Sequence, residues 1–412
     1  MEPTALGGTI NLHFRCNGCE LRSVSFQGSS LVEGSKRTVV GLALVVAFFL
    51  TGHGFAQFDR TLKQCLGIAC VSKNVYYDII KLVYPHLKDI LDEMCNKEKE
   101  RMKSLPDEDL GSWKRAVCTS DGVWHTRGHF SKNGSFVIKN YRTGGLLWYG
   151  HKCMRGNDNV VEDDLYLGTS KSMEGVLSDE CYKQAKDEGC LVEVVWQDGD
   201  SSSAKSVATH HPNGKVFKCG GHVGRAHANC LKEAAKKKEF SSDIKSKYKE
   251  KFPEVLKAKC SCERHKAGCG CLSDSFIKGA RINHFCCLQQ CKDPNEYAQR
   301  LRNLSQYHVR DIHEWEDGAC DFHPTKQCTC KKCDGDAEPE CEGSPYQTKH
   351  QLKCEYHWLA YVLECEKRAE EADSVIHPIM GRGHSNLCEA GFTVLPHFRS
   401  KTQSLCRYEF FF

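Results

Sequence analysis

The hydrophobic pattern indicates that the chain begins with a helical part. Residues 38–50 form an uncharged apolar run of thirteen residues, and the apolar positions of 73–105 recur at the spacing of an amphipathic helix. Pro85 lies inside the second pattern, so we expect it to kink or split that helix. Because a membrane-spanning helix needs about 20 apolar residues, residues 38–50 are expected to form a buried helix. A short membrane anchor is the alternative.

From residue 113 onwards the pattern alternates between strands and helices. Three hairpin-linked strands are predicted first, followed by helix, strand, helix, strand and helix. The predicted ranges, in that order, are 113–122, 135–142, 146–153, 173–190, 191–200, 201–211, 215–222 and 223–238. Gly189 is the expected C-terminal stop of the first of these helices. This order of elements predicts a mixed α/β sheet.

Composition adds one unusual feature, which is the number of cysteines and histidines. The 412 residues include 27 Cys and 20 His, and fourteen of the cysteines lie between Cys260 and Cys365, often next to histidine. The odd cysteine count, and the lack of an apolar run before Lys36 and Arg37 that would suggest a signal peptide, favour zinc ligands over disulfides. The content of 40% hydrophobic and 27% charged residues is that of a globular protein.

The net charge of +4 does not by itself indicate a nucleic-acid partner. Positive charge is concentrated in residues 232–259, which carry ten lysines against five acidic residues. This segment is expected to be either a solvated helix face or an arm that contacts phosphates.

Cysteine and histidine occur at the spacing of zinc ligands in the segment from 260 to 357. The predicted ligands are Cys260, Cys262, His265, Cys269, Cys271, Cys320, His323, Cys328, Cys330, Cys333, Cys341, Cys354 and His357. Because tetrahedral zinc takes four nitrogen or sulfur ligands, this number supports about three structural Zn²⁺ ions. The segment looks too polar to fold on an apolar core alone, so metal binding is expected to supply its folding energy.

Carboxylates follow two of the predicted strands. Asp121 comes at the end of the first strand, and Asp198 and Asp200 come at the end of the fourth. If these strands are neighbours, the carboxylates lie together and repel one another unless a divalent cation lies between them. Mg²⁺ prefers such oxygen ligands. The alternative is that both Asp-Gly sequences are ordinary turns.

Three sequence blocks together resemble the catalytic core of Mutator-like transposases, particularly the animal group. They are SDGVWHTRGH (120–129), WQDGDSSS (196–203) and CGGHVGRAHANCL (219–231), in the order found in that family. The resemblance covers about residues 40–240 and again about 376–402. It implies an RNase H-like fold and a catalytic triad of two aspartates and a glutamate that binds Mg²⁺ or Mn²⁺.

The resemblance also implies roles for individual residues. Asp121 matches the first catalytic acid, Asp198 the second, with Asp200 as the close alternative, and Glu389 the third. Cys219 and His222 match a C-x2-H element, which is either a structural metal site or a packing element. His227 and Cys230 could complete four ligands there, and Arg127 and His129 could steady the scissile phosphate.

The expected fold class is therefore α/β, with an RNase H-like mixed-sheet core, an N-terminal helical region and a Cys/His-rich zinc-binding insertion. The predicted divisions are a polar segment with a C-x2-C pair (1–36), the helical region (37–111), the catalytic core (112–240), a Lys-rich then Cys/His-rich insertion (241–375), and a C-terminal helix that carries the third acid and is expected to be truncated (376–412).

The expected function is that of a DNA transposase in the nucleus. The chain would hydrolyse phosphodiester bonds at transposon ends and transfer the strands, as a polynucleotidyl transferase of the DDE type. DNA is the expected partner, a homo-oligomer is left open, and no stable membrane association is expected. The alternative is a domesticated, catalytically inactive, zinc-structured DNA-binding protein.

Overall fold

The protein forms two compact units. The computed structural model describes residues 2–6, 9–15, 23–51, 53–68, 71–124, 132–154, 165–199, 201–262, 272–316, 318–320, 348 and 351–388. The first unit comprises Met1–Val195, Asp200–Lys215 and Ser385–Phe412, and the second comprises Trp196–Gly199 and Val216–His384.

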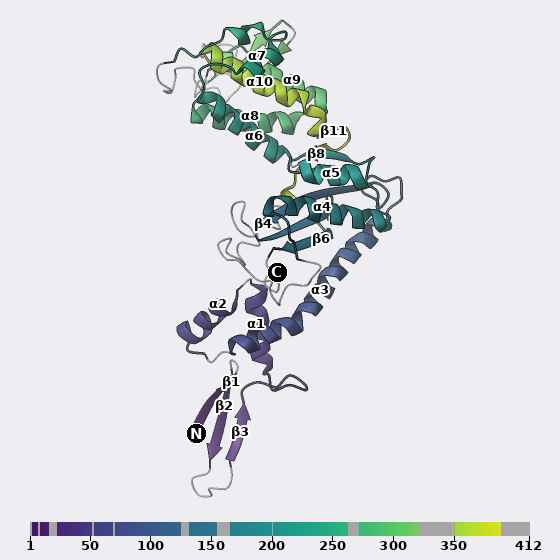
Figure 1. Ribbon diagram of the computed structural model, residues 1–412, viewed down its shortest axis with the longest axis vertical. Helices are drawn as coiled ribbons and strands as arrows, with labels where there is room; N and C mark the ends of the chain where they lie inside the picture. Colours follow the sequence, from purple (N-terminus) through teal and green to yellow (C-terminus); the bar gives the residue numbers. More distant parts are fainter. Residues whose placement is uncertain are drawn as a thin grey trace, which may run out of the picture. The chain divides into compact units, whose positions relative to one another are not determined.

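The first unit begins with a small antiparallel sheet of β1 (Glu2–Leu6), β2 (Thr9–Arg15) and β3 (Ser23–Gln27) (Figure 1). The apolar run then forms α1 (Val39–Leu50), which begins where the Thr38 side chain accepts a hydrogen bond from the Gly41 N–H. Val45 and Phe49 of α1 are buried against other helices. None of the helices in the described ranges is long and apolar enough to cross a membrane.

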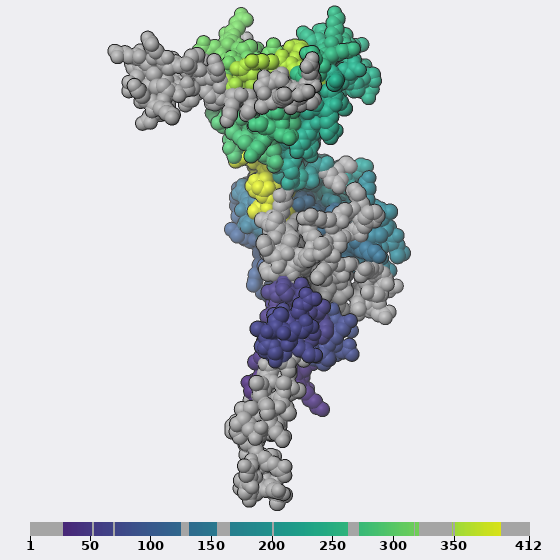
Figure 2. All heavy atoms as spheres, turned by 90° about the vertical axis from the view of Figure 1, so that its left-hand side faces the viewer, coloured from purple at the N-terminus to yellow at the C-terminus, as the bar shows by residue number. Residues whose placement is uncertain are grey.

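The helical region continues with α2 (Phe55–Asp59), the short π-helix η1 (Arg60–Cys65) and α3 (Lys73–Lys103). Together with α1 these helices form the purple and dark-blue group in Figure 2. The helix α3 is not split at Pro85, although proline removes one backbone donor from its ladder. Ile79 and Ile80, just before the proline, are buried in the apolar cluster shared with α1 and α2, which holds the helix together at this point.

The larger sheet has the predicted order of elements. It contains β4 (Ala116–Trp124), β5 (Asn133–Asn140), β6 (Leu146–Cys153), β7 (Val192–Gln197) and β8 (Lys215–Lys218), in the spatial order β6-β5-β4-β7-β8. The intervening helices are α4 (Ser170–Asp187), α5 (Ser201–His210) and α6 (Gly220–Ala235). The prediction of a mixed α/β sheet is confirmed. Gly189, with φ 79°, follows the end of α4 as predicted.

The strands β4 and β7 start side by side. The Leu191 N–H donates to the Trp113 carbonyl (3.0 Å), and the Leu191 carbonyl accepts from the Ala116 N–H (2.9 Å). Because these residues stand at or just before the beginning of each strand, the two strands run in the same direction from a common edge. The hairpin of β4, β5 and β6 is antiparallel throughout.

The second unit is mainly helical and has an apolar core of its own. After α6 come α7 (Ser242–Tyr248), η3 (Pro253–Leu256), α8 (Asp274–Gln290), α9 (Pro294–Gln306), η4 (His308–Arg310), β9 (Glu314–Trp315), β10 (Gly318–Ala319), α10 (Glu355–Glu370), η5 (Ala372–Ser374), β11 (Ile376–His377) and β12 (Gly381–Arg382). Figure 1 shows α6 beside α8 and α9 beside α10.

The segment after residue 260, whose sequence predicts that it is too polar to fold on an apolar core alone, contributes many residues to this core. Tyr297, Leu301 and Leu304 on α9 and Leu359 and Tyr361 on α10 are almost fully buried in one cluster. Their helical spacing gives each helix an apolar face, so burial of these faces contributes to folding in addition to any bound metal.

One glycine in the second unit is required by close packing. The Gly383 carbonyl accepts a hydrogen bond from the Gly220 N–H (3.3 Å). A Cβ atom at Gly383 would lie only 2.1 Å from the indole of Trp196, which is fully buried. Only a residue without a side chain can pass the indole at this distance.

Replacing Gly383 by alanine should therefore destabilise the second unit. We expect a loss of about 1–3 kcal/mol of unfolding free energy, as in other overpacked cores. Gly279→Ala is the matched control, because a Cβ there meets nothing within 4 Å and the position is inside α8. It should stabilise the protein by about 0.5–1 kcal/mol. Denaturant unfolding of both variants measures the difference, and equal stabilities would contradict the close packing.

Candidate functional site

Asp121 lies in the first unit, near the middle of β4. It pairs with Val137 of β5 and is half-buried, and its Oδ1 atom accepts a hydrogen bond from the Gly122 N–H (2.9 Å). The preceding Ser120 is buried and accepts a hydrogen bond from the Tyr182 hydroxyl (2.8 Å), which ties β4 to α4. The strand that carries Asp121 is thus fixed from two sides.

A second carboxylate, Glu174 of α4, packs against the same point of β4. A Cβ atom at Gly122 would lie 2.8 Å from the Glu174 carboxyl carbon, so the glycine makes room for this side chain. Glu174 is not among the candidate site residues predicted from the sequence. It stands in an ordinary amphipathic helix, and no local signal separates it from the solvent-facing acids of that helix.

The chain returns to β4 at the end of the described residues. The Cys388 thiol lies 3.8 Å from the Thr119 hydroxyl, and the Leu387 carbonyl accepts a hydrogen bond from the Lys139 ammonium of β5 (3.0 Å). Cys388 directly precedes Glu389, the predicted third acid. Glu389, Asp200, Arg127 and His129 lie outside the described residues.

Asp198 belongs to the second unit, where it meets the C-x2-H element. Its Oδ2 atom lies 3.2 Å from Nε2 of His222, in the first turn of α6. The N-cap of this helix is Cys219, whose N–H donates to the Gln197 carbonyl next to Asp198 (2.8 Å). A hydrogen bond with Cys219 and the charge of Asp198 raise the pKa of His222, despite its partial burial. A protonated His222 can therefore neutralise Asp198.

The structure does not bring His227 and Cys230 to Cys219 and His222. The His227 ring is fully buried, stacks on His284 at 5.1 Å and has its Nδ1 atom 3.7 Å from Glu364. The Cys230 thiol accepts from the Arg368 guanidinium at 3.9 Å. Among the residues that the structure describes, none of these four belongs to a group of three or more ligand atoms that could hold a metal ion.

Four other predicted ligands do come together in the second unit. Cys260, Cys262, Cys354 and His357 each offer a ligand atom within 4.8 Å of all the others, and the Cys260 thiol lies 3.7 Å from His357 Nδ1. Three sulfurs and one nitrogen form the donor set of a structural zinc site. This group could hold a metal ion.

Local structure positions these ligands in two pairs. Cys354 is the N-cap of α10 and His357 is in its first turn, so both side chains lie at the same end of the helix. The chain before Cys260 is held by a bridge between Glu239 and Lys259 and by the hydrogen bond from the Cys260 N–H to the Lys238 carbonyl (2.8 Å). Two segments far apart in the sequence thereby supply two ligands each.

The other predicted zinc ligands are distributed differently. Cys320 lies in a separate group with His308 and His313, two histidines that are not among the ligands predicted from the sequence. The remaining predicted ligands are outside the described residues. They are His265, Cys269, Cys271, His323, Cys328, Cys330, Cys333 and Cys341.

The Lys-rich segment is partly neutralised by ion pairs. Five of its ten lysines pair with carboxylates: Lys236 with Glu233, Lys245 and Lys259 with Glu239, Lys247 with Glu370, and Lys251 with Glu366. Two of these partners, Glu366 and Glu370, are on α10. The segment therefore packs on α10 through its charges, which favours a helix face over a free phosphate-binding arm.

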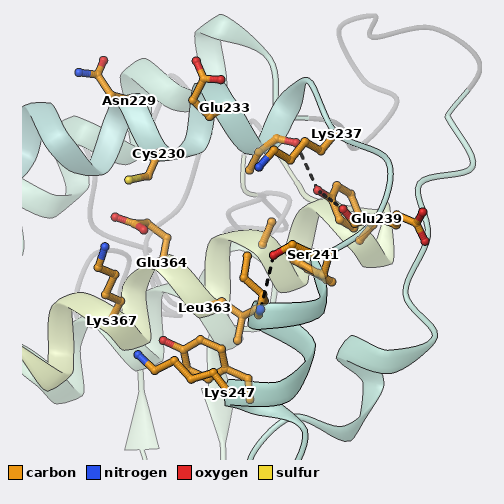
Figure 3. Close-up of a pocket in the computed structure, with 16 residues that line it drawn as sticks. Asn229, Cys230, Glu233, Lys237, Glu239, Ser241, Lys247, Leu363, Glu364 and Lys367 are labelled. Carbon is orange, nitrogen blue, oxygen red and sulfur yellow. Dashed lines mark hydrogen bonds between the residues drawn. The ribbon is translucent and has the colours of Figure 1, made fainter.

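A pocket of about 540 Å³ lies between α6, α7 and α10. Figure 3 shows Glu364 and Lys367 of α10 facing Cys230 of α6 across it. Its charged lining residues are Lys237, Lys247, Lys367, Glu233, Glu239 and Glu364. Because equal numbers of opposite charges line the pocket, it has no clear preference for an anion or a cation.

Comparison with protein families identifies one match. A family model described as Mutator-like transposase matches residues 2–298. The match includes Asp121, Asp198 and the pair Cys219 and His222, and ends within α9, before Cys354. No curated protein matches the chain.

Loss of one ligand should remove one zinc ion from the full-length protein. We expect Cys354→Ser and His357→Ala each to lower the zinc content by one ion per chain, because three ligands hold the ion less tightly. Cys65→Ser is the matched control, since Cys65 is exposed and far from the group in sequence. Elemental analysis of the purified proteins measures the content. Unchanged zinc in both ligand variants would refute the site.

Proposed function

The chain belongs to the Mutator-like transposases, and we propose that it cuts DNA at transposon ends and joins the freed ends to target DNA. We propose further that its core is RNase H-like. The five-stranded mixed sheet, with helices between β6, β7 and β8, supports this assignment. The adjacent, co-directional starts of β4 and β7 support it as well, because strands that run together end at the same edge of a sheet.

The proposed catalytic acids are Asp121, Asp198 and Glu389, with Asp200 as the alternative second acid. A set of carboxylate oxygens fits Mg²⁺ or Mn²⁺, since these hard cations prefer oxygen ligands and keep sites for water and phosphate. Two such ions, when bound, would activate the attacking oxygen and stabilise the leaving oxygen. The attacking group is water in hydrolysis and a DNA 3′-hydroxyl in strand transfer, with no covalent enzyme intermediate.

The observation that carries this proposal is the contact of Cys388 with Thr119. Thr119 and Asp121 are two residues apart on β4, so their side chains project from the same face of the sheet. The Cys388 thiol, 3.8 Å from the Thr119 hydroxyl, reaches that face one residue before Glu389. The contact joins two segments 269 positions apart in the sequence. It supports Glu389 as the third acid.

His222 has a proposed role beside the second acid. Its imidazole lies 3.2 Å from Asp198, and a raised pKa favours its cationic form. A cation there reduces the repulsion between Asp198 and other carboxylates when no metal is bound. We expect His222 to act as a positioning residue, and not as a group that touches the scissile phosphate.

A second candidate function is a zinc-structured DNA-binding protein without catalysis. The group of Cys260, Cys262, Cys354 and His357 favours it, because such a group can build a binding module that needs no nuclease activity. The two candidates share DNA as partner and differ in metal-dependent strand cleavage.

Replacing Asp121 by asparagine should abolish cleavage and preserve DNA binding. We expect nicking of supercoiled plasmid DNA in Mn²⁺ to fall by about 100-fold or more, since a lost metal ligand costs several kcal/mol of transition-state stabilisation. Asp89→Asn is the control, because Asp89 is exposed on α3. Gel-shift assays on the same DNA test binding.

Two results would count against the transposase proposal. If Asp121→Asn nicks DNA as fast as the parent protein, Asp121 is not a catalytic acid. If the parent binds DNA and does not nick it in Mg²⁺ or Mn²⁺, the inactive DNA-binding protein is the better description.

A further inference from the structure

A second group of ligand-type side chains lies in the second unit, outside the proposed catalytic site. His308, His313 and Cys320 each offer a ligand atom within 4.8 Å of the other two. The Nδ1 atom of His308 is 3.2 Å from the Cys320 thiol. His308 and Cys320 are buried and His313 is half-buried, so the group is shielded from bulk water.

A short hairpin brings these three residues together. The helix α9 ends at Gln306, and η4 begins at His308. The strands β9 and β10 then pair antiparallel, and the Cys320 N–H donates to the His313 carbonyl (2.8 Å). The rings of Tyr307 and Trp315 stack at 4.5 Å between centroids, with nearly parallel planes. The loop is thus closed by backbone and aromatic contacts around the ligand group.

Asp311 orients one of the histidines. Its Oδ1 atom accepts a hydrogen bond from His313 Nε2 (3.1 Å). Its carboxylate also accepts from the Thr348 N–H (2.6 Å) and from the Gln351 side-chain amide (2.8 Å). A neutral histidine that donates from Nε2 presents its lone pair at Nδ1, which leaves that atom for a metal ion.

The backbone at Asp311 is in a left-handed conformation, with φ 64°. Among the described residues it is the one non-glycine residue with positive φ. Non-glycine residues other than asparagine and aspartate rarely adopt the left-handed conformation. This conformation turns the chain at the end of η4 and places the carboxylate beside His313.

We propose that His308, His313 and Cys320 bind a second Zn²⁺ ion, and that Asp311 is a positioning residue for His313. Nitrogen and sulfur donors suit zinc, and a histidine ligand ordinarily donates its other ring N–H to a carboxylate or carbonyl. The described residues supply three ligands of a tetrahedral ion and leave one position to a further ligand. The proposal does not depend on DNA cleavage.

Hydrogen bonds tie the start of this hairpin to the segment that precedes α10. The Thr348 hydroxyl donates to the His308 carbonyl (2.9 Å), and the Leu352 N–H donates to the Val309 carbonyl (2.9 Å). Both partners lie just before Cys354, a member of the first ligand group. The hairpin that carries the second ligand group is therefore connected by hydrogen bonds to the segment that leads to the first group.

Zinc content of the full-length protein tests the proposal. We expect His313→Ala to lose one zinc ion per chain and His86→Ala, an exposed histidine on α3, to lose none. The double variant His313→Ala with His357→Ala should lose two ions, because the two groups are separate sites. Unchanged zinc in His313→Ala, or loss of one ion only in the double variant, would overturn the proposal.

The variant His313→Cys tests whether misfolding explains the loss of zinc from His313→Ala. Cysteine is also a zinc ligand, so this variant should retain the ion that His313→Ala loses. In protein loaded with Co²⁺ it should change the visible absorption, because a sulfur donor replaces a nitrogen donor. An unchanged cobalt spectrum would show that residue 313 is not a ligand.

Asp311 variants test the positioning role. Asp311→Gly relaxes the left-handed backbone and removes the carboxylate, whereas Asp311→Asn keeps a hydrogen-bond acceptor. Competition with a chelator measures the affinity for the zinc ion that His313→Ala loses. We expect Asp311→Gly to lower this affinity by about 10- to 100-fold, and Asp311→Asn to lower it less. Equal zinc affinity of Asp311→Gly and the parent would exclude the positioning role.

Discussion

The return of the chain to β4 and β5 at Leu387 and Cys388 is the contact on which the rest of the proposed site depends. Gly383 passes the buried Trp196 indole so closely that no side chain fits. Within the first unit, Cys388 then meets Thr119 of β4. Cys388 directly precedes Glu389 in the sequence, so the proposal of Glu389 as the third acid rests on this contact within the first unit.

The second unit combines an apolar core with candidate metal sites, and the two occupy different parts of the helices. Buried faces of α6, α8, α9 and α10 supply a cluster that resembles the core of an ordinary helical domain. The ligand groups lie where helices begin or end, at the start of α10 and just after α9. A metal ion bound at such a place would fix a connection between segments that are distant in the sequence. This distribution explains how a chain so rich in cysteine can still bury large aromatic residues.

The order of strands and helices could be predicted from the sequence because alternating and helical hydrophobic periods are local signals. Gly189, which follows the end of α4 with a positive φ, is a local signal of the same kind. The partners of Cys260 and Cys262 could not be predicted, since Cys354 and His357 come about ninety residues later and many other cysteines have similar spacing. His308 and His313 carried no motif, and Glu174 carried none either. Their positions follow from a hairpin and from helix packing, which only tertiary structure defines. The helix α3 continues through Pro85, because burial of neighbouring residues outweighs the tendency of proline to interrupt a helix.

The proposed function requires that Asp121 and Asp198 together hold catalytic cations. A crystal structure of the protein with Mn²⁺, with the ion located by anomalous scattering, tests it most directly. We predict an anomalous peak within coordination distance of both carboxylates, with any second ion about 4 Å from the first. Carboxylates more than about 10 Å apart could not share ions at that separation, and such a distance would show that Asp121 and Asp198 do not form one catalytic site.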